Sequence, residues 1–284
     1  VLHRPCGHRT NLRFRCTRLC SGHPSPSTLH CKLMNLRDCL HQIAHSPTIE
    51  ELWDAHTRQM ADYGFDRLIY GFTRYRTPTS LGDPADFVIL SNQSPEYLNG
   101  YLHSGLYFNA PMLRWALNNE GACSWGALPE ITHGDDLSES EKRVVDFNAR
   151  MEVTAGYTIS FRSISARSKG AIALTARRGL TQDEVDAIWD EHGADIQLMN
   201  EIAHLKILSL PYSSPNRSLT RRQLEVLQWV GDGKTTQDIA LLMGLTAPTV
   251  EKHLRLARDA LSVETTAQAV LKAAFANQMF VMDP

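Results

Sequence analysis

Residues 219–261 read LTRRQLEVLQWVGDGKTTQDIALLMGLTAPTVEKHLRLARDAL and predict three short helices in succession. Thr220, with a glutamine three residues later, has the pattern of a capping box that opens the first helix. Thr235 or Thr236 can cap the second helix, and Gly244 is placed to end it. Three helices at this spacing are typical of a helix-turn-helix.

The third of these helices has two different faces. Pro248 suits its first turn, where the missing N–H costs nothing. Its apolar face carries Val250, Leu254, Ala257 and Leu261. Its opposite face carries Thr249, Glu251, Lys252, His253, Arg255 and Arg258. The DNA major groove accepts such a helix, with cations on phosphates and the other side chains facing base edges.

A solvated face on an ordinary helical bundle is the alternative interpretation of this polar surface. Residues from Arg217 onward hold eight Lys/Arg against seven Asp/Glu, so the region is hardly basic. Charge alone therefore does not separate a DNA-binding face from a solvated one.

The whole string from Leu219 resembles the helix-turn-helix shared by LuxR-type and NarL-type regulators. The residues at that motif's usual positions are Glu225, Leu227, Gly233, Lys234, Thr235, Ile239, Ala240, Thr249, Val250 and His253. The resemblance implies binding to a double-stranded DNA operator as a homodimer, with RNA polymerase as a further candidate partner. It also implies that Lys234 and Thr249 lie at the interface, that Glu251 and Arg255 reach bases, and that Lys252, His253 and Arg258 contact mainly phosphate.

Length and composition are those of a globular protein with about two domains. The chain has 284 residues, of which 43% are hydrophobic and 21% charged, and its net charge is -2. No apolar run approaches the roughly 18 residues that a membrane-spanning helix needs, so we expect a cytoplasmic protein without a membrane partner. We predict a ligand domain over 34–208, a Pro- and Ser-rich linker over 209–218 and the DNA-binding domain over 219–284.

The first 33 residues differ from the rest in having six Lys/Arg, no Asp or Glu, and a high content of Cys and His. Zinc binding is one interpretation, because these are zinc ligands. However, no CxxC pair is present, and the cysteine spacing matches no standard finger. We therefore expect a disordered or untranslated upstream extension, and no metal site.

Within residues 34–208, two predicted strands lie in the first half of the segment and two in the second half, with helices between and after the two pairs. Strands are predicted over 65–75, 86–93, 156–164 and 170–177, and helices over 49–63, 96–105, 111–119, 139–151 and 182–208, with a further helix beginning after Met34. This order predicts an α+β fold, in which an antiparallel sheet is covered on both faces as an α/β/α sandwich.

Aromatic residues concentrate between Asn92 and Trp125, at positions 97, 101, 107, 108, 115 and 125. Core packing would explain them, but Tyr97 and Tyr101 lie on one helix face and their phenols would need partners if buried. A pocket with a polar ligand would provide those partners.

The segment from Gly64 to Gly126 resembles the autoinducer-binding domain of LuxR-type acyl-homoserine-lactone receptors. The resemblance implies that Tyr97 bonds the lactone carbonyl, that Tyr101 bonds the acyl carbonyl and that Trp125 packs on the lactone ring. Pro111, Gly156 and Thr158 also match the family. The strand residues that would line the acyl chain are Ile69, Gly71, Phe87, Ile89 and Ala171.

This chain departs from that family where the ligand is held. Ala110 stands where the family has an aspartate that accepts the ligand amide N–H, and Asn109 beside it could present a carbonyl instead. Tyr97 replaces a tryptophan, and Ala173 replaces a Ser or Thr, with Thr175 two residues on and facing the same way. We therefore expect a small diffusible amphipathic signal, with an acyl-homoserine lactone as the first candidate, and no cofactor.

Two other functions were weighed against a ligand-gated regulator. A phosphorylation-driven response regulator would need a doubly wound receiver with paired acids, and the first strands offer no such pattern. An enzyme could use Cys123 or Ser124 with His103 or His133, but no nucleophile elbow, HExxH, P-loop or GxGxxG occurs. We expect no catalytic activity.

Overall fold

A computed structural model describes residues 35–132, 137–163, 165–212, 214 and 217–279. The basic extension over 1–33 lies outside the described residues. The strands are β1 (Phe65–Thr73), β2 (Val88–Ser91), β3 (Gly121–Ser124), β4 (Gly156–Ser160) and β5 (Lys169–Ala176). The helices are α1 (Leu36–His45), α2 (Ile49–Asp62), α3 (Pro95–Leu98), α4 (Pro111–Asn118), α5 (Leu128–Ile131), α6 (Glu139–Arg150), α7 (Gln182–Ser209), α8 (Arg221–Gly231), α9 (Thr236–Met243), α10 (Ala247–Leu261) and α11 (Thr266–Phe275).

The strands form one antiparallel sheet in the order β2-β1-β5-β4-β3. Ala173 in the middle strand lies opposite Ile69 of β1 on one side and Thr158 of β4 on the other. This sheet confirms the predicted α+β class, and its antiparallel order excludes the parallel sheet that a receiver domain would need. The short edge strand β3 was not predicted.

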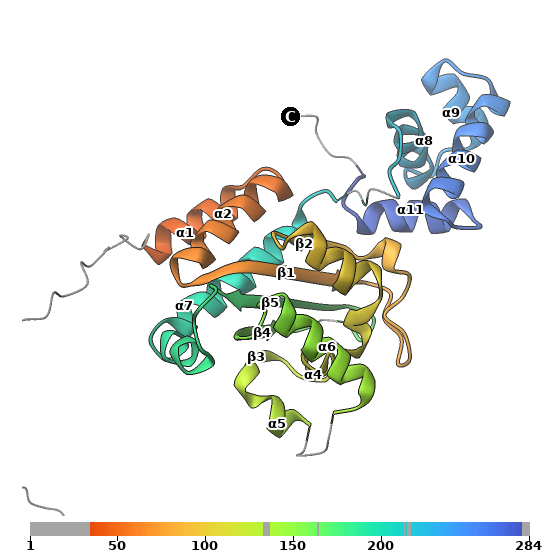
Figure 1. The fold of residues 1–284 in the computed structure, drawn as a ribbon. Helices are drawn as coiled ribbons and strands as arrows, with labels where there is room; N and C mark the ends of the chain where they lie inside the picture. Colours follow the sequence, from red (N-terminus) through yellow and green to blue (C-terminus); the bar gives the residue numbers. More distant parts are fainter. Residues whose placement is uncertain (1–34, 133–136, 164, 213, 215–216, 280–284) are drawn as a thin grey trace, which may run out of the picture. The chain divides into compact units, whose positions relative to one another are not determined.

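Side chains alternate between the two faces of the sheet along each strand, so one face can pack in a core while the other borders a cavity. Leu68 and Tyr70 of β1 and Leu174 of β5 are buried in the core that α1, α2 and α7 complete. In Figure 1, α7 runs behind the strands, and α4 and α6 lie on their other side. The intervening strand residues, such as Ile69 and Ala173, face that second layer and line a cavity.

The helix starts follow the predicted caps with one difference. Ser138 with Glu141 at α6, and Thr181 with Glu184 at α7, form complete capping boxes. At α2 only half of the predicted box forms, because Thr48 Oγ1 accepts from the Glu51 N–H at 3.2 Å without a reciprocal bond. The local signals therefore position these helices correctly.

The single helix predicted over 96–105 is divided. Its first part is α3, which Ser94 caps, and a π-helical turn follows over Asn99–His103. Gly100 in this turn lets α6 come close, because a Cβ there would lie 2.5 Å from ring atoms of Phe147. The π-helical turn therefore lies where this segment packs closely against α6.

Helices α8 to α11 enclose a second apolar core. Thr220 and Thr235 form the capping boxes that open α8 and α9, and Gly244 ends α9 in the left-handed conformation at φ +65°. Pro248 lies in the first turn of α10. The predicted inner face of α10 is buried at Val250, Leu254, Ala257 and Leu261. The predicted succession of three helices is confirmed.

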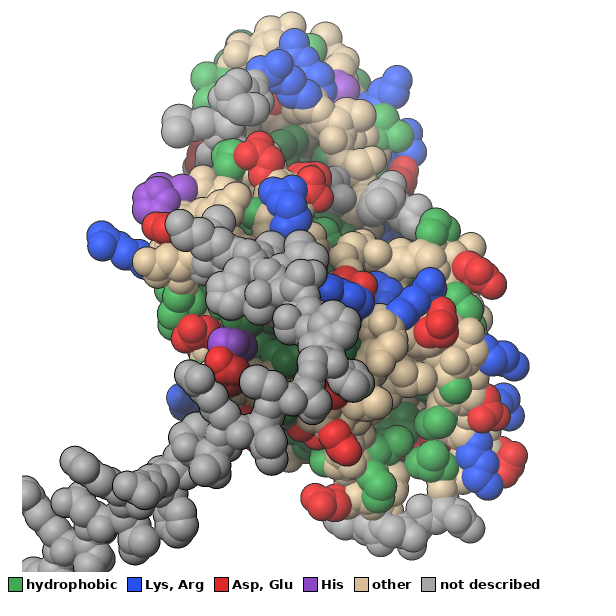
Figure 2. All heavy atoms as spheres, turned by 60° about the vertical axis from the view of Figure 1, so that its left-hand side comes forward, with side chains coloured by type: hydrophobic (Ala, Val, Ile, Leu, Met, Phe, Trp, Pro, Cys, Tyr) green, Lys and Arg blue, Asp and Glu red, His purple; other side chains and the backbone are tan. Residues whose placement is uncertain are grey.

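Figure 2 shows Lys and Arg side chains interspersed with Asp and Glu over one face of the molecule, as the net charge of -2 leads one to expect. Among the described residues, no helix combines the length and apolar character that crossing a membrane requires.

Candidate functional site

A cavity of about 340 Å³ lies between the second face of the sheet and the layer that contains α3, α4 and α6. Its walls are mostly aliphatic and aromatic, as in sites for small amphipathic molecules. The strand residues predicted to line it all do so, and they are Ile69, Gly71, Phe87, Ile89 and Ala171.

Polar side chains from several elements meet at one end of this cavity. Trp125 Nε1 donates to Thr158 Oγ1 at 2.9 Å, and Tyr97 Oη donates to Asn148 Oδ1 at 2.9 Å. Gln93 Nε2 donates to Thr175 Oγ1 at 3.3 Å. All of these residues line the cavity. They leave a short row of hydrogen-bonding groups in an otherwise apolar space.

Three phenols line the cavity, and only the hydroxyl of Tyr97 has a hydrogen-bond partner among the described residues, so those of Tyr101 and Tyr107 are both free of such partners. The ring of Tyr101 stacks on Tyr97 with the ring centroids 5.1 Å apart. Burial raises the pKa of Tyr101, so its hydroxyl stays neutral at physiological pH and can donate or accept. A ligand oxygen at this place would satisfy a group that the protein itself leaves free.

Trp125 depends on Gly156 for its place in the wall. A Cβ at Gly156 would lie 2.2 Å from the carbonyl oxygen of Leu174 and 3.1 Å from the Trp125 ring. Only glycine therefore allows the indole to pack against β4 at this point.

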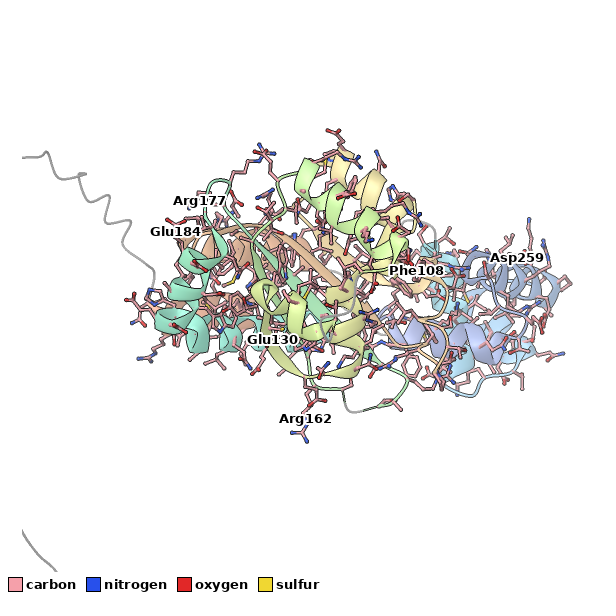
Figure 3. The ribbon with its side chains drawn as sticks, turned by 60° about the horizontal axis from the view of Figure 1, so that its bottom comes forward. Phe108, Glu130, Arg162, Arg177, Glu184 and Asp259 are labelled. Carbon is pink, nitrogen blue, oxygen red and sulfur yellow. The ribbon has the colours of Figure 1, made fainter. Side chains whose placement is uncertain are left out.

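The cavity contains no carboxylate among its described lining residues. Ala110 is 4% exposed and lines the cavity at the N-terminus of α4. Asn109 beside it is exposed and lies outside the cavity wall, contrary to the prediction that it presents a carbonyl there. The reason is local, because Asn109 ends a 3-10 turn whose exposed Phe108 is labelled in Figure 3.

The outer face of α10 carries the residues predicted to contact DNA. Glu251, Lys252 and Arg255 are exposed, and so is Lys234 before α9. Arg255 Nη1 pairs with Asp259 Oδ2 at 3.1 Å, and the labelled Asp259 projects outward in Figure 3. The exposed guanidinium is therefore held along the helix by an ion pair that a base edge or phosphate could replace.

Glu251, Thr249 and Arg258 of this face have partners within the helical bundle. Thr236 Oγ1 donates to Glu251 Oε1 at 2.9 Å, which ties α9 to α10. Thr249 and Thr246 share a hydroxyl hydrogen bond of 2.9 Å at the start of α10. Arg258 is only half exposed and donates to Thr266 Oγ1 at 2.9 Å. His253 is also half exposed.

Comparison with known proteins connects these two parts of the chain. A model of the autoinducer binding domain matches residues 48–207, and a model of bacterial regulatory proteins of the luxR family matches residues 217–273. The chain belongs to the luxR family. This luxR-family protein is a ligand-responsive, DNA-binding transcriptional regulator.

Its relatives include transcriptional activators of similar architecture. The chain is 26% identical over 211 residues to the transcriptional activator protein ExpR of Dickeya dadantii, which covers 69% of this chain and 78% of ExpR. It is 25% identical over 247 residues to the transcriptional activator protein SolR of Ralstonia nicotianae, with 84% and 95% covered. Among solved structures, Escherichia coli SdiA aligns with a TM-score of 0.48 and 18% identity, over 87% of this chain and 98% of SdiA.

Sequence reasoning missed several polar cavity residues of this luxR-family protein, including Asn148 and Gln93. Asn148 lies four residues after Val144 on the same face of α6, and both line the cavity. That spacing was a usable signal, since it puts an amide on an apolar face. Gln93 lies two residues after the end of β2, and its contact with Thr175 of β5 could not be read from local sequence because the two lie 82 residues apart.

The residues weighed for catalysis do not assemble a nucleophile and a base within the described residues. Ser124 Oγ donates to Asp186 Oδ1 at 2.8 Å, and His103 Nδ1 contacts Asn99 Oδ1 at 2.8 Å. Burial raises the pKa of the Cys123 thiol, which disfavours its nucleophilic form. His133 lies outside the described residues. No group of His, Cys, Asp and Glu in the described part of the chain could hold a metal ion.

Proposed function

We propose that the cavity binds an acyl-homoserine lactone or a closely related amphipathic signal with a neutral, acceptor-rich head group. The observation that carries this proposal is the Tyr101 hydroxyl, which is free of described partners inside an apolar cavity. A ligand carbonyl suits this end, because it can accept from the phenol of Tyr101. An aliphatic tail suits the walls formed by Ile69, Phe87 and Ile89.

The cavity favours ligands that need no carboxylate. The amide N–H of an acyl-homoserine lactone would have to donate to a neutral acceptor in this cavity. The wall offers Asn148 Oδ1 and Thr158 Oγ1 as acceptors of this kind. A charged acceptor would strengthen such a bond, so its absence lowers the affinity expected for the amide. An ester in place of the amide would lose nothing at this position.

We further propose that ligand binding controls operator binding by a homodimer. The ligand part would be 34–208, and 209–218 would link it to the helical part over 219–284. Exposed Leu198 and Leu205 of α7, at 38% and 61%, offer an apolar surface to a second copy. Two copies of α10 would read half-sites about one helical turn apart on a palindrome. RNA polymerase is a further proposed partner, and the cytoplasm is the proposed compartment.

Extraction of small molecules from the purified protein, followed by mass spectrometry, tests the ligand directly. Thermal-shift titration with acyl-homoserine lactones of several chain lengths then measures binding in the full chain. A bound ligand at a hundred times its Kd should add about 2.7 kcal/mol of stability. No co-purifying amphiphile, together with no stabilisation by any chain length, would overturn the ligand assignment. Sedimentation of the liganded protein as a pure monomer at micromolar concentration would overturn the dimer.

A further inference from the structure

The cavity has a second polar end, at Lys169. Residues 169, 171, 173 and 175 of β5 alternate onto one face of the sheet, and all four line the cavity. Six residues along a strand span roughly 20 Å, so Lys169 lies far from Thr175 and from the Gln93 amide that contacts Thr175. The Lys169 side chain is 8% exposed. Among the described residues that line the cavity, it alone carries a charge.

The ammonium of Lys169 has a donor to spare. Its Nζ donates to the carbonyl oxygen of Asn119 at 2.9 Å and, more weakly, to that of Phe161 at 3.4 Å. An ammonium has three N–H donors, so one finds no acceptor among the described residues. The hydroxyls of Thr73 and Ser160 donate to backbone carbonyls at 2.7 to 2.8 Å, and no hydrogen bond joins either of them to Lys169.

Lys169 also has no counter-ion within the described residues, because no carboxylate there lies close enough to form an ion pair with it. Burial lowers its pKa, while Glu120 raises it and Arg76 lowers it further. Lys169 also borders a shallow surface depression with Asn118 and Glu120, so this residue contributes to the wall of both the depression and the cavity. A buried cation without a counter-ion is costly even with carbonyl acceptors, and a ligand carboxylate would offset that cost.

We propose that Lys169 binds an oxygen acceptor at the far end of the ligand's tail, a carboxylate above all, so that the signal is polar at both ends. This inference rests on the proposed function, which places the ligand head near Tyr101. A tail that ends in a methyl group would leave the third N–H unpaired. A terminal carboxylate would form a charge-assisted hydrogen bond with it, which corresponds to about 10- to 100-fold in affinity.

A matched pair of acyl-homoserine lactones tests this, one with a methyl terminus and one with a carboxylate at the end of a tail of the same length. Dissociation constants are measured by thermal-shift titration of the full chain over several tail lengths. The parent protein should bind the carboxylate probe at least tenfold more tightly at one length. Lys169→Met, which keeps the length of the side chain, should abolish or reverse that preference.

Lys142→Met makes the same change at an exposed lysine of α6 and should leave the preference intact. If the parent protein prefers the methyl probe at every length, Lys169 only closes the cavity and the inference is overturned, whether or not the Lys169 variant folds. If neither probe binds the parent protein, the proposed function fails and this inference fails with it. Binding of both probes without a preference overturns the inference alone.

Discussion

Tyr101 presents a hydroxyl that the described part of the protein does not use, in a ring that is otherwise packed on Tyr97. Tyr101→Phe keeps this packing and removes only the hydroxyl. The free energy of unfolding without ligand should therefore change little. The ligand-induced stabilisation should fall, because a buried neutral hydrogen bond contributes about 0.5–1.5 kcal/mol. Thermal shifts with and without an acyl-homoserine lactone separate the two effects.

Tyr107→Phe removes the other hydroxyl of the cavity wall that has no described partner, so comparing the two variants shows which of the two phenols contacts the ligand. A Tyr101→Phe protein stabilised by ligand as strongly as the parent protein would move the polar contact elsewhere in the cavity.

Ala110 marks the position where a carboxylate would meet a ligand amide. It is the N-cap residue of α4 and makes no side-chain capping bond. Ala110→Asp should tighten an acyl-homoserine lactone by a decade or more, since a charge-assisted bond replaces a neutral contact. A cap gained at α4 would add about 1 kcal/mol to the unliganded protein, so stability is measured in both states.

Weaker binding by Ala110→Asp would show that the native signal has no N–H at this place, because the new charge would then be buried without a partner. Ala116→Asp is no substitute as a control, since that residue is 0% exposed inside α4. Asn109→Asp, which adds the same charge outside the cavity wall, is the appropriate comparison.

Two buried histidines make the ligand-domain core sensitive to acid. Burial lowers the pKa of His56 and of His204 to about 4. In the unfolded chain a histidine titrates near 6.5, so below that pH the unfolded state binds protons that the native state cannot. Stability is therefore complete above about pH 6.5 and falls between about 6.5 and 4, by at most about 3 kcal/mol for each histidine.

Urea unfolding at pH 7.5, 6 and 5 measures this loss. His56→Gln can keep a bond to Asn200, which now contacts His56 Nε2 at 2.9 Å, and should flatten the pH dependence. His103→Gln alters an exposed ring and should leave the slope unchanged. An unaltered slope in His56→Gln would contradict the assignment.

At the scale of single elements, α10 is divided into residues that would read sequence and residues that would bind phosphate. Arg255→Ala should cost about 1–3 kcal/mol of operator binding and relax the preference at one base pair. Lys252→Ala should instead weaken binding to all DNA sequences alike. It should also reduce the salt dependence of the binding constant by about one phosphate contact. Selection from random DNA and titrations in increasing salt distinguish these effects.

The ion pair of Arg255 with Asp259 supplies a control within the same helix. Asp259→Asn removes that pair and leaves the guanidinium free, so it should not alter the preferred operator. An unchanged operator preference in Arg255→Ala would show that α10 enters the groove in another register. Arg258→Ala should also loosen the contact with Thr266 at α11, so its effect on DNA binding includes a loss of stability.

At the scale of the whole molecule, the sheet joins two layers with different roles. One face is sealed by α1, α2 and α7 around Leu68, Tyr70 and Leu174. The other face borders the cavity, where Gly71 and Ala173 have small or no side chains and so leave space above the strands. Filling this space should therefore impair ligand binding more than folding. Large residues on the core face stabilise the fold, and small residues on the cavity face leave room for the ligand.

The sequence by itself determined the helices of the C-terminal part and most of the fold before it. Caps such as Thr220 and Thr181, and the stop at Gly244, act within a few residues of the chain, so they can be read locally. The β-branched and aromatic residues of β1 and β2 likewise predicted those strands. The strand β3 could not be read in this way, because its four residues exist as a strand only through pairing with β4.

Only the tertiary structure decided which groups meet in the cavity. Local spacing states which face of an element a residue lies on, but it does not state what lies opposite that face. The hydrogen bond of Tyr97 with Asn148 depends on the packing of α6, which local sequence does not state. Asn109 does not line the cavity, because it ends a 3-10 turn and is exposed. Lys169 is the clearest case, since a lysine at the start of a strand usually faces water. Here the antiparallel register and the end of α4 bury it beside the cavity.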